Sequence, residues 1–417
     1  MSIKKILFVS PTGTLDNGAE ISIFYLMTFL KSKGYEIYNV VPQAHNNKQV
    51  EYFERYEEQG ISTHFIPILK WWWEDAPGGS PGLSKERAFF YRENISEIRK
   101  LIQENDIDLI ITNTVNMFQG AMAAAAESIP HYWLIHEFPT GEFGYYRNRI
   151  DFLEEYSEKL FCVTGELHSY LEPLFSKAIG TFAPYTKIKK HTVKSAEKKR
   201  FVSVGRLTER KNQLELIKAF EMIDLDGVEL VFIGAWDNSY KKKCMAYIQS
   251  HHIKNVQFCG GLEDPWTEIT NKDICILPSK LETFGLVYAE AILNGIPTIL
   301  SDNPGHLSAY EIFHFGNLYK SGDPKDLSKK MEQLFKNFEK EKEESLSFVP
   351  KANSYYQVET VYKEIIDSIS KESGNQLRAI RHVADLYSTN ENKSRLAKAE
   401  QRVRKLYFKV RNRIDNN

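Results

Sequence analysis

The sequence has few of the features that mark disulfide-stabilised, zinc-bound or membrane-spanning proteins. Its four cysteines, among 417 residues, are far apart and lack paired C-x-x-C spacing, which argues against a disulfide framework and a zinc site. No apolar run approaches the roughly 18 residues that a membrane span needs. The first ten residues have too short an apolar core for a signal peptide. We therefore expect a cytoplasmic protein in a reducing compartment.

The composition also excludes a disordered or fibrous chain. With 42% hydrophobic and 26% charged residues it is globular, and its length favours two domains. The net charge of −1 conceals an asymmetry, because residues 371–417 hold 12 Lys and Arg against 5 Asp and Glu. This tail therefore carries +7, and residues 1–370 carry −8. The body is acidic and the tail basic.

Short runs rich in Ile, Val and Phe alternate with longer amphipathic stretches, and this pattern of βαβ units around a parallel sheet occurs twice. The predicted strands are 5–9, 36–41, 63–66, 109–112, 131–135 and 160–164 in the first half, and 200–204, 229–233, 256–259, 274–277 and 298–300 in the second. The lysine-rich segment 187–199 connects the halves. We predict an α/β fold of two Rossmann-like, doubly wound parallel-sheet domains. Ligands of such sheets bind at the carboxyl ends of the strands, which places the site in the cleft between the domains.

The predicted domain boundaries are 1–186 and 187–353, followed by a closing helix at 354–370 and a basic amphipathic helical tail at 371–417. The tail has an apolar stripe at helical spacing, formed by Leu396, Ala399, Val403, Leu406, Val410 and Ile414. Such a helix can lie on an anionic membrane surface. The alternatives are a helix docked on the body and a coiled coil with a partner. Nucleic-acid binding is not expected, since no supporting fold motif is present.

The segment after the predicted strand 274–277 has the strongest chemical pattern. Glu282, Phe284 and Gly285 precede a predicted helix at 286–293, which contains Glu290. Free backbone N–H groups at the start of a helix bind anions. Carboxylates beside them accept hydrogen bonds from vicinal diols, so the pattern suits a phosphate between two hydroxyl-rich groups. A sugar nucleotide is such a ligand.

Two cations follow the first strand of the same half. Arg206 and Lys211 come five residues apart after a glycine turn. Arginine is a bidentate phosphate ligand and lysine a mobile point charge, so the pair can hold a diphosphate and neutralise it as it leaves. This chemistry needs no metal and no cofactor.

These segments resemble the retaining glycosyltransferases of the GT-B fold, family 4. The resemblance extends over most of residues 1–370 and is densest at 200–300. The family has an Arg and a Lys five apart, and an E-x-F-G-x-x-x-x-E arrangement that Glu282, Phe284, Gly285 and Glu290 match. The sequence is therefore expected to have the GT-B fold, with an N-terminal acceptor-side domain and a C-terminal donor domain.

The resemblance implies a role for each matching residue. Glu282 would contact the donor sugar, Glu290 the ribose, and Arg206 and Lys211 the diphosphate. The start of the helix, from Phe284 through Gly285 to Leu286, would bind the donor. The strand end from Phe258 to Leu262, with its Gly-Gly pair, resembles the segment that cradles the base.

The first half carries weaker matches. The loop 11–20, with Gly13 and Gly18, resembles the family's G-G-A-E loop, although Asn17 replaces the first glycine. Its glycines would let the backbone approach the phosphates. His136 follows the strand 131–135 and would contact the donor sugar and the reaction centre, while Glu137 stands where the family often has Asp.

Two D-x-D sequences resemble the metal-binding motif of another glycosyltransferase fold. Asp106 and Asp108 lead into a strand, and Asp224 and Asp226 lie in a loop before one, so neither pair is expected to bind metal. The cluster Trp71, Trp72 and Trp73 would contact the acceptor or a lipid, or pack a long loop.

The sequence thus predicts a retaining hexosyltransferase that moves a sugar from a nucleoside diphosphate, expected to be UDP, to a hydroxyl of a saccharide or lipid-linked acceptor. Such an enzyme would act in the synthesis of cell-surface polysaccharide or glycoconjugate, at the cytoplasmic face of the membrane if the tail binds lipid. Two alternatives remain: a catalytically silent GT-B subunit that binds an acceptor or partner, and a GT-B nucleotide-sugar epimerase.

Overall fold

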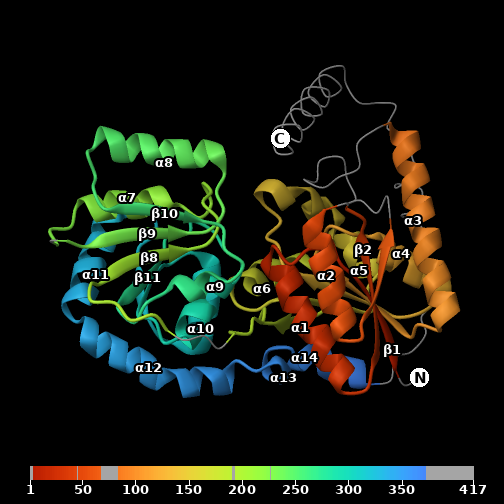
Figure 1. Ribbon diagram of the computed structural model, residues 1–417. Coiled ribbons are helices and arrows are strands. Elements are labelled where there is room, and N and C mark those ends of the chain that lie inside the picture. Colours follow the sequence, from red (N-terminus) through yellow and green to blue (C-terminus); the bar gives the residue numbers. More distant parts are fainter. Residues whose placement is uncertain (1–2, 45, 67–82, 190–192, 226, 372–417) are drawn as a thin grey trace.

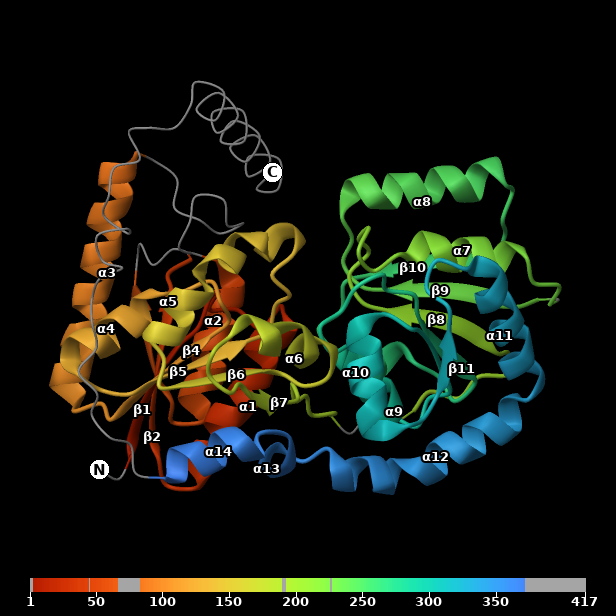
Figure 2. The same cartoon turned by 180° about the vertical axis from the view of Figure 1, so that it is seen from behind.

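A computed structural model describes residues 3–44, 46–66, 83–189, 193–225 and 227–371 (Figure 1). The tryptophan cluster at 71–73 and the basic tail from residue 372 lie outside the described residues. Two parallel sheets, each covered by helices, lie side by side in Figures 1 and 2. The predicted fold class is confirmed.

The first sheet has the strand order β3-β2-β1-β4-β5-β6-β7. Its strands are β1 Lys5–Val9, β2 Glu36–Pro42, β3 Ser62–Ile66, β4 Leu109–Asn113, β5 His131–Ile135, β6 Lys159–Val163 and β7 Gly180–Phe182. Every residue of β4 and β5 is buried. Central parallel strands are covered on both faces, which explains why these two strands are mainly apolar.

The second sheet has the strand order β10-β9-β8-β11-β12-β13. Its strands are β8 Arg200–Val204, β9 Glu229–Ile233, β10 Val256–Gly260, β11 Asp273–Leu277, β12 Thr298–Ser301 and β13 Asn317–Tyr319. All the strands predicted from the sequence are present. The sequence missed β7 and β13, which have three residues each and lie at sheet edges, where an apolar run is too short to be recognised.

Helices connect successive strands in both halves. Those of the first half are α1 Gly18–Ser32, α2 Asn47–Glu58, α3 Ser84–Asn105, α4 Gln119–Glu127, η1 Gly141–Arg149, α5 Ile150–Glu155, α6 Glu166–Leu171 and η2 Glu172–Leu174. Those of the second half are α7 Gln213–Glu221, α8 Asn238–Ser250, η3 Pro265–Glu268, α9 Leu286–Leu293, α10 Pro304–Phe313 and α11 Pro324–Lys336.

Up to residue 371, where the described part of the chain ends, the chain passes between the halves twice. The first crossover follows β7, and the second follows α12 Phe338–Tyr355. After the second crossover the chain forms α13 Val358–Val361 and α14 Lys363–Ser370, which lie against the first half (Figures 1 and 2). The backbone N–H and the hydroxyl of Thr181 in β7 donate to the Glu364 carboxylate at 3.0 and 2.9 Å, which fixes α14 there.

The prediction of a single closing helix at 354–370 is therefore wrong. This segment contains the last residues of α12 and two short helices, α13 and α14. Tyr356 and Tyr362, which interrupt the helical segments, are both buried, at 2% and 0% exposure. The apolar spacing is helical throughout, but the chain has to turn as it passes from one half to the other.

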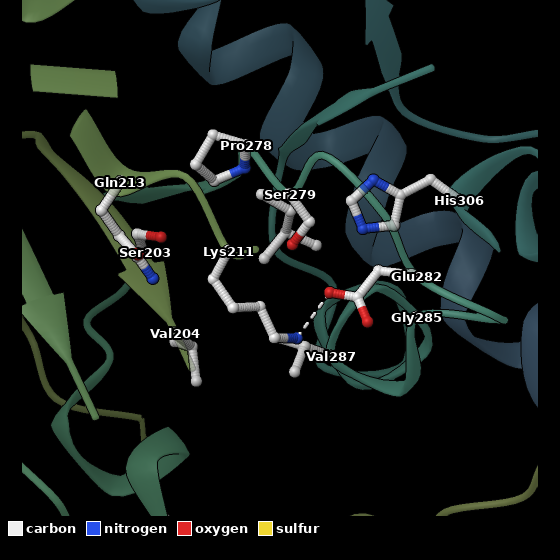
Figure 3. A pocket seen from close by; sticks show the side chains of 11 residues that line it. Ser203, Val204, Lys211, Gln213, Pro278, Ser279, Glu282, Gly285, Val287 and His306 are labelled. Atoms are coloured by element: carbon white, nitrogen blue, oxygen red, sulfur yellow. Dashed lines mark ion pairs between the residues drawn. The ribbon is translucent and has the colours of Figure 1, made fainter. Parts of the chain in front are cut away.

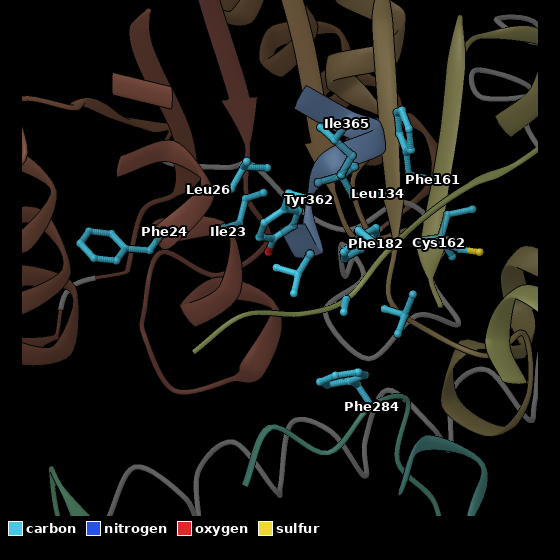
Figure 4. Packing of buried hydrophobic residues seen from close by; sticks show 14 of the residues in the cluster. Ile23, Phe24, Leu26, Leu134, Phe161, Cys162, Phe182, Phe284, Tyr362 and Ile365 are labelled. Atoms are coloured by element: carbon cyan, nitrogen blue, oxygen red, sulfur yellow. The ribbon is translucent and has the colours of Figure 1, made fainter. Parts of the chain in front are cut away.

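Side chains from both halves form one buried cluster where the sheets meet. Phe284, from the loop before α9, is 3% exposed and belongs to the same cluster as Phe182, Tyr362 and Ile23 (Figure 4). Gly165 contributes a second contact, since a Cβ there would lie 2.6 Å from the Cβ of Ser308 in α10. These contacts set the positions of α10 and of the loop before α9 against the first half.

Candidate functional site

The site is built at the carboxyl end of β11. The chain leaves the strand through a loop and enters α9 at Gly285, whose φ of 91° lies in the left-handed region that glycine adopts without strain. The observed helix has the predicted bounds, Leu286–Leu293. Its first backbone N–H groups therefore lie beside the end of the strand, as an anion site requires.

Glu282 is the centre of the loop between β11 and α9. It is 7% exposed, and its two oxygens lie 2.7 Å from Lys211 Nζ and 2.8 Å from Arg210 Nη1. Burial alone raises the pKa of this carboxyl, but Lys211 and Arg210 more than compensate and hold the pKa at about 2. The carboxylate is charged at neutral pH.

Asn303 holds this loop against the start of α10. Its side-chain oxygen accepts from the backbone N–H of Glu282 at 3.1 Å, and from those of Gly305 and His306 at 3.1 and 3.2 Å. The backbones of Gly305 and Glu282 approach so closely that a Cβ at position 305 would lie 2.3 Å from the Glu282 carbonyl carbon. The position of Glu282 thus depends on residues that follow β12.

His306 is a site residue that the sequence did not identify. It is 2% exposed, and a Cβ on Gly285 would lie 2.8 Å from its Cδ2. Burial lowers the pKa of His306 to about 4, although the Glu282 carboxylate acts in the opposite direction. The imidazole is therefore neutral at pH 7.

A pocket lies among these groups, at the carboxyl ends of β8 and β11 (Figure 3). Its polar lining comprises Ser203, Lys211, Gln213, Ser279, Glu282 and His306. The ammonium group of Lys211 points toward the Glu282 carboxylate, beside Val287 of α9 (Figure 3). A cation, a carboxylate and a helix start thus meet in one place.

The two arginines near Lys211 have different surroundings. Arg206, expected to face the diphosphate, is exposed, and its carbonyl accepts from Gln213 Nε2 at 3.1 Å. Arg210 instead reaches Glu282, and it also donates to the Leu281 carbonyl at 3.0 Å. The one feature of the sequence that could have identified Arg210 is its position directly before Lys211. The role of Arg206 toward the diphosphate stays a prediction.

Glu290 lies farther along α9. Its oxygens accept from Thr186 Oγ1 at 2.9 Å and from Trp266 Nε1 at 3.0 Å. Burial raises the pKa of Glu290, and both hydrogen bonds act against that shift. Its contact with a ribose stays a prediction.

The predicted base segment, from Phe258 to Leu262, comprises the end of β10 and the start of the loop that follows it. The ring of Phe258 stacks on Phe232 at a centroid distance of 5.1 Å, so it packs partly into the core. Leu262 is 41% exposed in the loop after β10. Neither contact tests the predicted role in base binding.

The loop at 11–20 is ordered by Glu20. Its carboxylate accepts from the backbone N–H of Thr12 at 2.8 Å and of Gly13 at 3.2 Å. Asn17, which replaces a glycine of the family loop, caps α1 by accepting from the Glu20 N–H at 3.0 Å. This helix cap gives Asn17 a structural role at the position where the family has glycine.

Gly18 lies where this loop approaches α9. A Cβ at Gly18 would lie 2.9 Å from Leu286 Cδ1, the first residue of α9. The starts of α1 and α9 therefore meet across the boundary between the halves, and a side chain at position 18 would displace the end of Leu286.

His136 and Glu137 follow β5 in the first half. His136 is 8% exposed, and its Nε2 lies 2.8 Å from Asn113 Oδ1. Burial lowers the pKa of His136 to about 3, which keeps the ring neutral. Glu137 accepts from the N–H groups of Val115 and His136 at 3.3 and 3.1 Å, so it holds the ends of β4 and β5 together.

The first D-x-D sequence has a structural role. Asp108 accepts from the backbone N–H groups of Lys4 and Lys5 at 2.8 and 2.9 Å, beside the start of β1. Asp106 ends α3 with a φ of 53°, and Asp224 is exposed. Asp226 lies outside the described residues. Within the described ranges, no group of three His, Cys, Asp or Glu side chains is placed to hold a metal ion.

The shifted pKa of Glu282 predicts how stability depends on pH. Because the folded pKa is about 2 and the ordinary value is 4.5, ionised Glu282 stabilises the fold fully above pH 4.5, and this contribution is lost as the pH falls toward 2. The contribution is about 3 kcal/mol. Urea unfolding should show that Glu282→Gln is less stable near neutral pH and that the difference shrinks between about pH 4.5 and about pH 3. A difference that stayed constant over this range would contradict the ion pairing.

The chain is similar to known glycosyltransferases over part of its length. Residues 184–347 match the family model described as glycosyl transferases group 1. The chain is 28% identical over 133 residues to the capsular polysaccharide biosynthesis glycosyltransferase CapM of Staphylococcus aureus. It is 24% identical over 251 residues to CapH of the same species. These alignments cover 31% and 57% of this chain, and 35% and 66% of the relatives.

Solved structures resemble almost the whole described body. Anabaena HepE in complex with UDP and glucose has a TM-score of 0.68 at 17% identity, covering 88% of this chain and 99% of HepE. TarM has a TM-score of 0.69 at 13% identity, covering 89% of this chain and 99% of TarM. Among the described residues, no helix has the length and apolar character needed to cross a membrane.

Proposed function

We propose that this chain, which has the GT-B glycosyltransferase fold and contains a group 1 glycosyl transferase segment at residues 184–347, transfers a sugar from a nucleoside diphosphate to an acceptor hydroxyl. The observation that supports this most strongly is the pairing of Lys211 with the buried Glu282 at 2.7 Å, beside the start of α9. A diphosphate and a sugar need these neighbouring groups, a cation with a helix start for one and a carboxylate for the other.

In the proposed reaction the donor diphosphate takes the ammonium group of Lys211 as its partner. The Glu282 carboxylate keeps its ion pair with Arg210, at 2.8 Å, and accepts hydrogen bonds from the donor sugar. The bond from the anomeric carbon to the diphosphate oxygen breaks, and a bond to the acceptor oxygen forms. Lys211 stabilises the charge that develops on the leaving diphosphate, and such preorganised electrostatic contacts are usually the largest catalytic contribution.

The acceptor proton passes to the departing phosphate oxygen in this proposal. Attack would then occur on the face that the phosphate leaves, and the product would retain the anomeric configuration. His136, neutral and 2.8 Å from Asn113, would orient the donor sugar from the first half. The fixed cations of the site supply the charge that another transferase would take from a metal ion.

The comparisons favour UDP as the nucleoside diphosphate and a polysaccharide as the acceptor. HepE was solved with UDP and glucose, and both CapM and CapH are glycosyltransferases of capsular polysaccharide biosynthesis. We therefore propose a UDP-sugar donor and a growing surface saccharide, free or lipid-linked.

A donor screen tests this proposal. The full chain is incubated with UDP-, GDP- and dTDP-sugars, with and without saccharide acceptors, and the released nucleotide is measured. We expect release of UDP from UDP-sugars, stimulated by an acceptor, and a product whose anomeric proton coupling in NMR shows retention. Conversion of the nucleotide sugar without release would favour an epimerase, and the absence of any nucleotide binding would favour a silent subunit.

A further inference from the structure

The carboxylate of Glu290 is held by two uncharged donors from separate parts of the chain. Thr186 Oγ1 donates to Oε1 at 2.9 Å, and Trp266 Nε1 donates to Oε2 at 3.0 Å. Thr186 is 4% exposed and Trp266 is 5% exposed. Each carboxylate oxygen keeps one further lone pair, so the group can still accept two hydrogen bonds. Two neighbouring hydroxyls of a ligand would use both.

Thr186 is itself fixed by the two crossovers between the halves. It belongs to the first crossover, and its backbone N–H lies 3.2 Å from the hydroxyl of Tyr356 in the second. The same hydroxyl donates to the carbonyl of Pro184. The rings of Tyr185 and Tyr356 stack at 5.1 Å. The hydroxyl that contacts Glu290 is thus anchored to both connections.

Trp266 fixes the other oxygen from η3. Asp264 caps this short helix by accepting from the Trp266 backbone N–H at 3.1 Å. This hydrogen bond fixes the backbone that carries the indole. A single hydrogen bond would let the Glu290 carboxylate rotate. With one donor on each oxygen, the plane of the carboxylate is set.

We propose that Thr186 and Trp266 are positioning residues that orient the Glu290 carboxylate toward the vicinal hydroxyls of the donor ribose. This inference rests on the proposed function, which makes the ligand a nucleoside diphosphate. It extends that function to residues outside the matched motif, one on the crossover and one on η3.

A thermodynamic cycle on the full chain tests the inference. The binding of UDP and of 2′,3′-dideoxy-UDP is measured by isothermal titration for the unaltered chain, Thr186→Val, Thr186→Ser and Trp266→Phe. We expect Thr186→Val and Trp266→Phe to weaken UDP binding about tenfold, the scale of one hydrogen bond to a charged group. Binding of the dideoxy nucleotide should change less than about twofold, and Thr186→Ser, which keeps the hydroxyl, should restore UDP binding.

The outcomes separate a positioning role from a purely structural one. Equal weakening for both nucleotides would overturn the inference, since a structural defect does not depend on the ribose hydroxyls. Equal affinity of the unaltered chain for both nucleotides would also overturn it. If the unaltered chain bound no UDP, the proposed function would fail, and the inference with it.

Discussion

Replacement of Lys211 with Ala is expected to lower sugar transfer by at least about a hundredfold, on the scale of losing one preorganised electrostatic contact. Lys211 lines the pocket, and its ammonium group lies 2.7 Å from Glu282. The substitution removes the cation proposed to neutralise the leaving diphosphate. Steady-state kinetics with a UDP-sugar and an acceptor measure the effect, and most of the loss should appear in kcat because the charge develops in the transition state.

Lys243→Ala is the matched control for this substitution. The ammonium group of Lys243 lies 2.7 Å from Glu209, which is in the same segment as Lys211. The side chain of Lys243 is 55% exposed on α8. Transfer by Lys243→Ala should stay within about twofold of that of the unaltered chain, since exposed ion pairs contribute little. Near-normal turnover by Lys211→Ala would contradict the assignment of the cation.

Replacement of Gly305 with Ala is expected to abolish most of the transfer without altering any charged group. The added Cβ would lie 2.3 Å from the carbonyl carbon of Glu282 and 2.4 Å from its oxygen. Both are backbone atoms, so the loop that carries Glu282 has to move. We expect a loss of at least about a hundredfold in transfer, comparable to loss of the contact itself, and a decrease of about 1–3 kcal/mol in the free energy of unfolding.

Gly144→Ala provides the control, because no heavy atom lies within 4 Å of a Cβ built there. Its activity and its urea unfolding should match those of the unaltered chain. If Gly305→Ala were as active as Gly144→Ala, then the position of Glu282 would not depend on the contact between the loop and α10.

The sequence predicted the parts of the structure that local patterns determine. The central strands are mainly apolar because they are covered on both faces, and Gly285 marks the start of α9 because only a left-handed residue fits there. Glu282 and Lys211 were found by their spacing within a family motif, and the structure brings them together. The boundaries of α12 to α14 were not predictable, because the breaks arise where the chain crosses between the halves.

The missed site residues depend on tertiary contacts. Asn303 and His306 follow β12, yet Asn303 holds the loop after β11 and His306 lines the pocket. No pattern within their own segment relates them to Glu282. Thr186 likewise reaches Glu290 only because the first crossover passes beside α9.

The spacing of the family motif did not identify Arg210. Arg206 and Lys211 match the family motif, but in the structure Arg210 is the arginine that reaches Glu282. The spacing of the motif gives no indication that the side chain of Arg210 reaches the loop after β11. Arg206 stays a predicted diphosphate ligand.

Titration of UDP into the full chain tests the central claim most directly, namely that the pocket beside Lys211 and Glu282 binds a nucleoside diphosphate. Isothermal titration should show saturable binding at one site per chain for the unaltered protein. The same titration should show binding weakened at least about tenfold in Lys211→Ala, since a charge-assisted phosphate contact is lost. Absence of binding by the unaltered chain, or equal affinity of the two proteins for UDP, would contradict the claim.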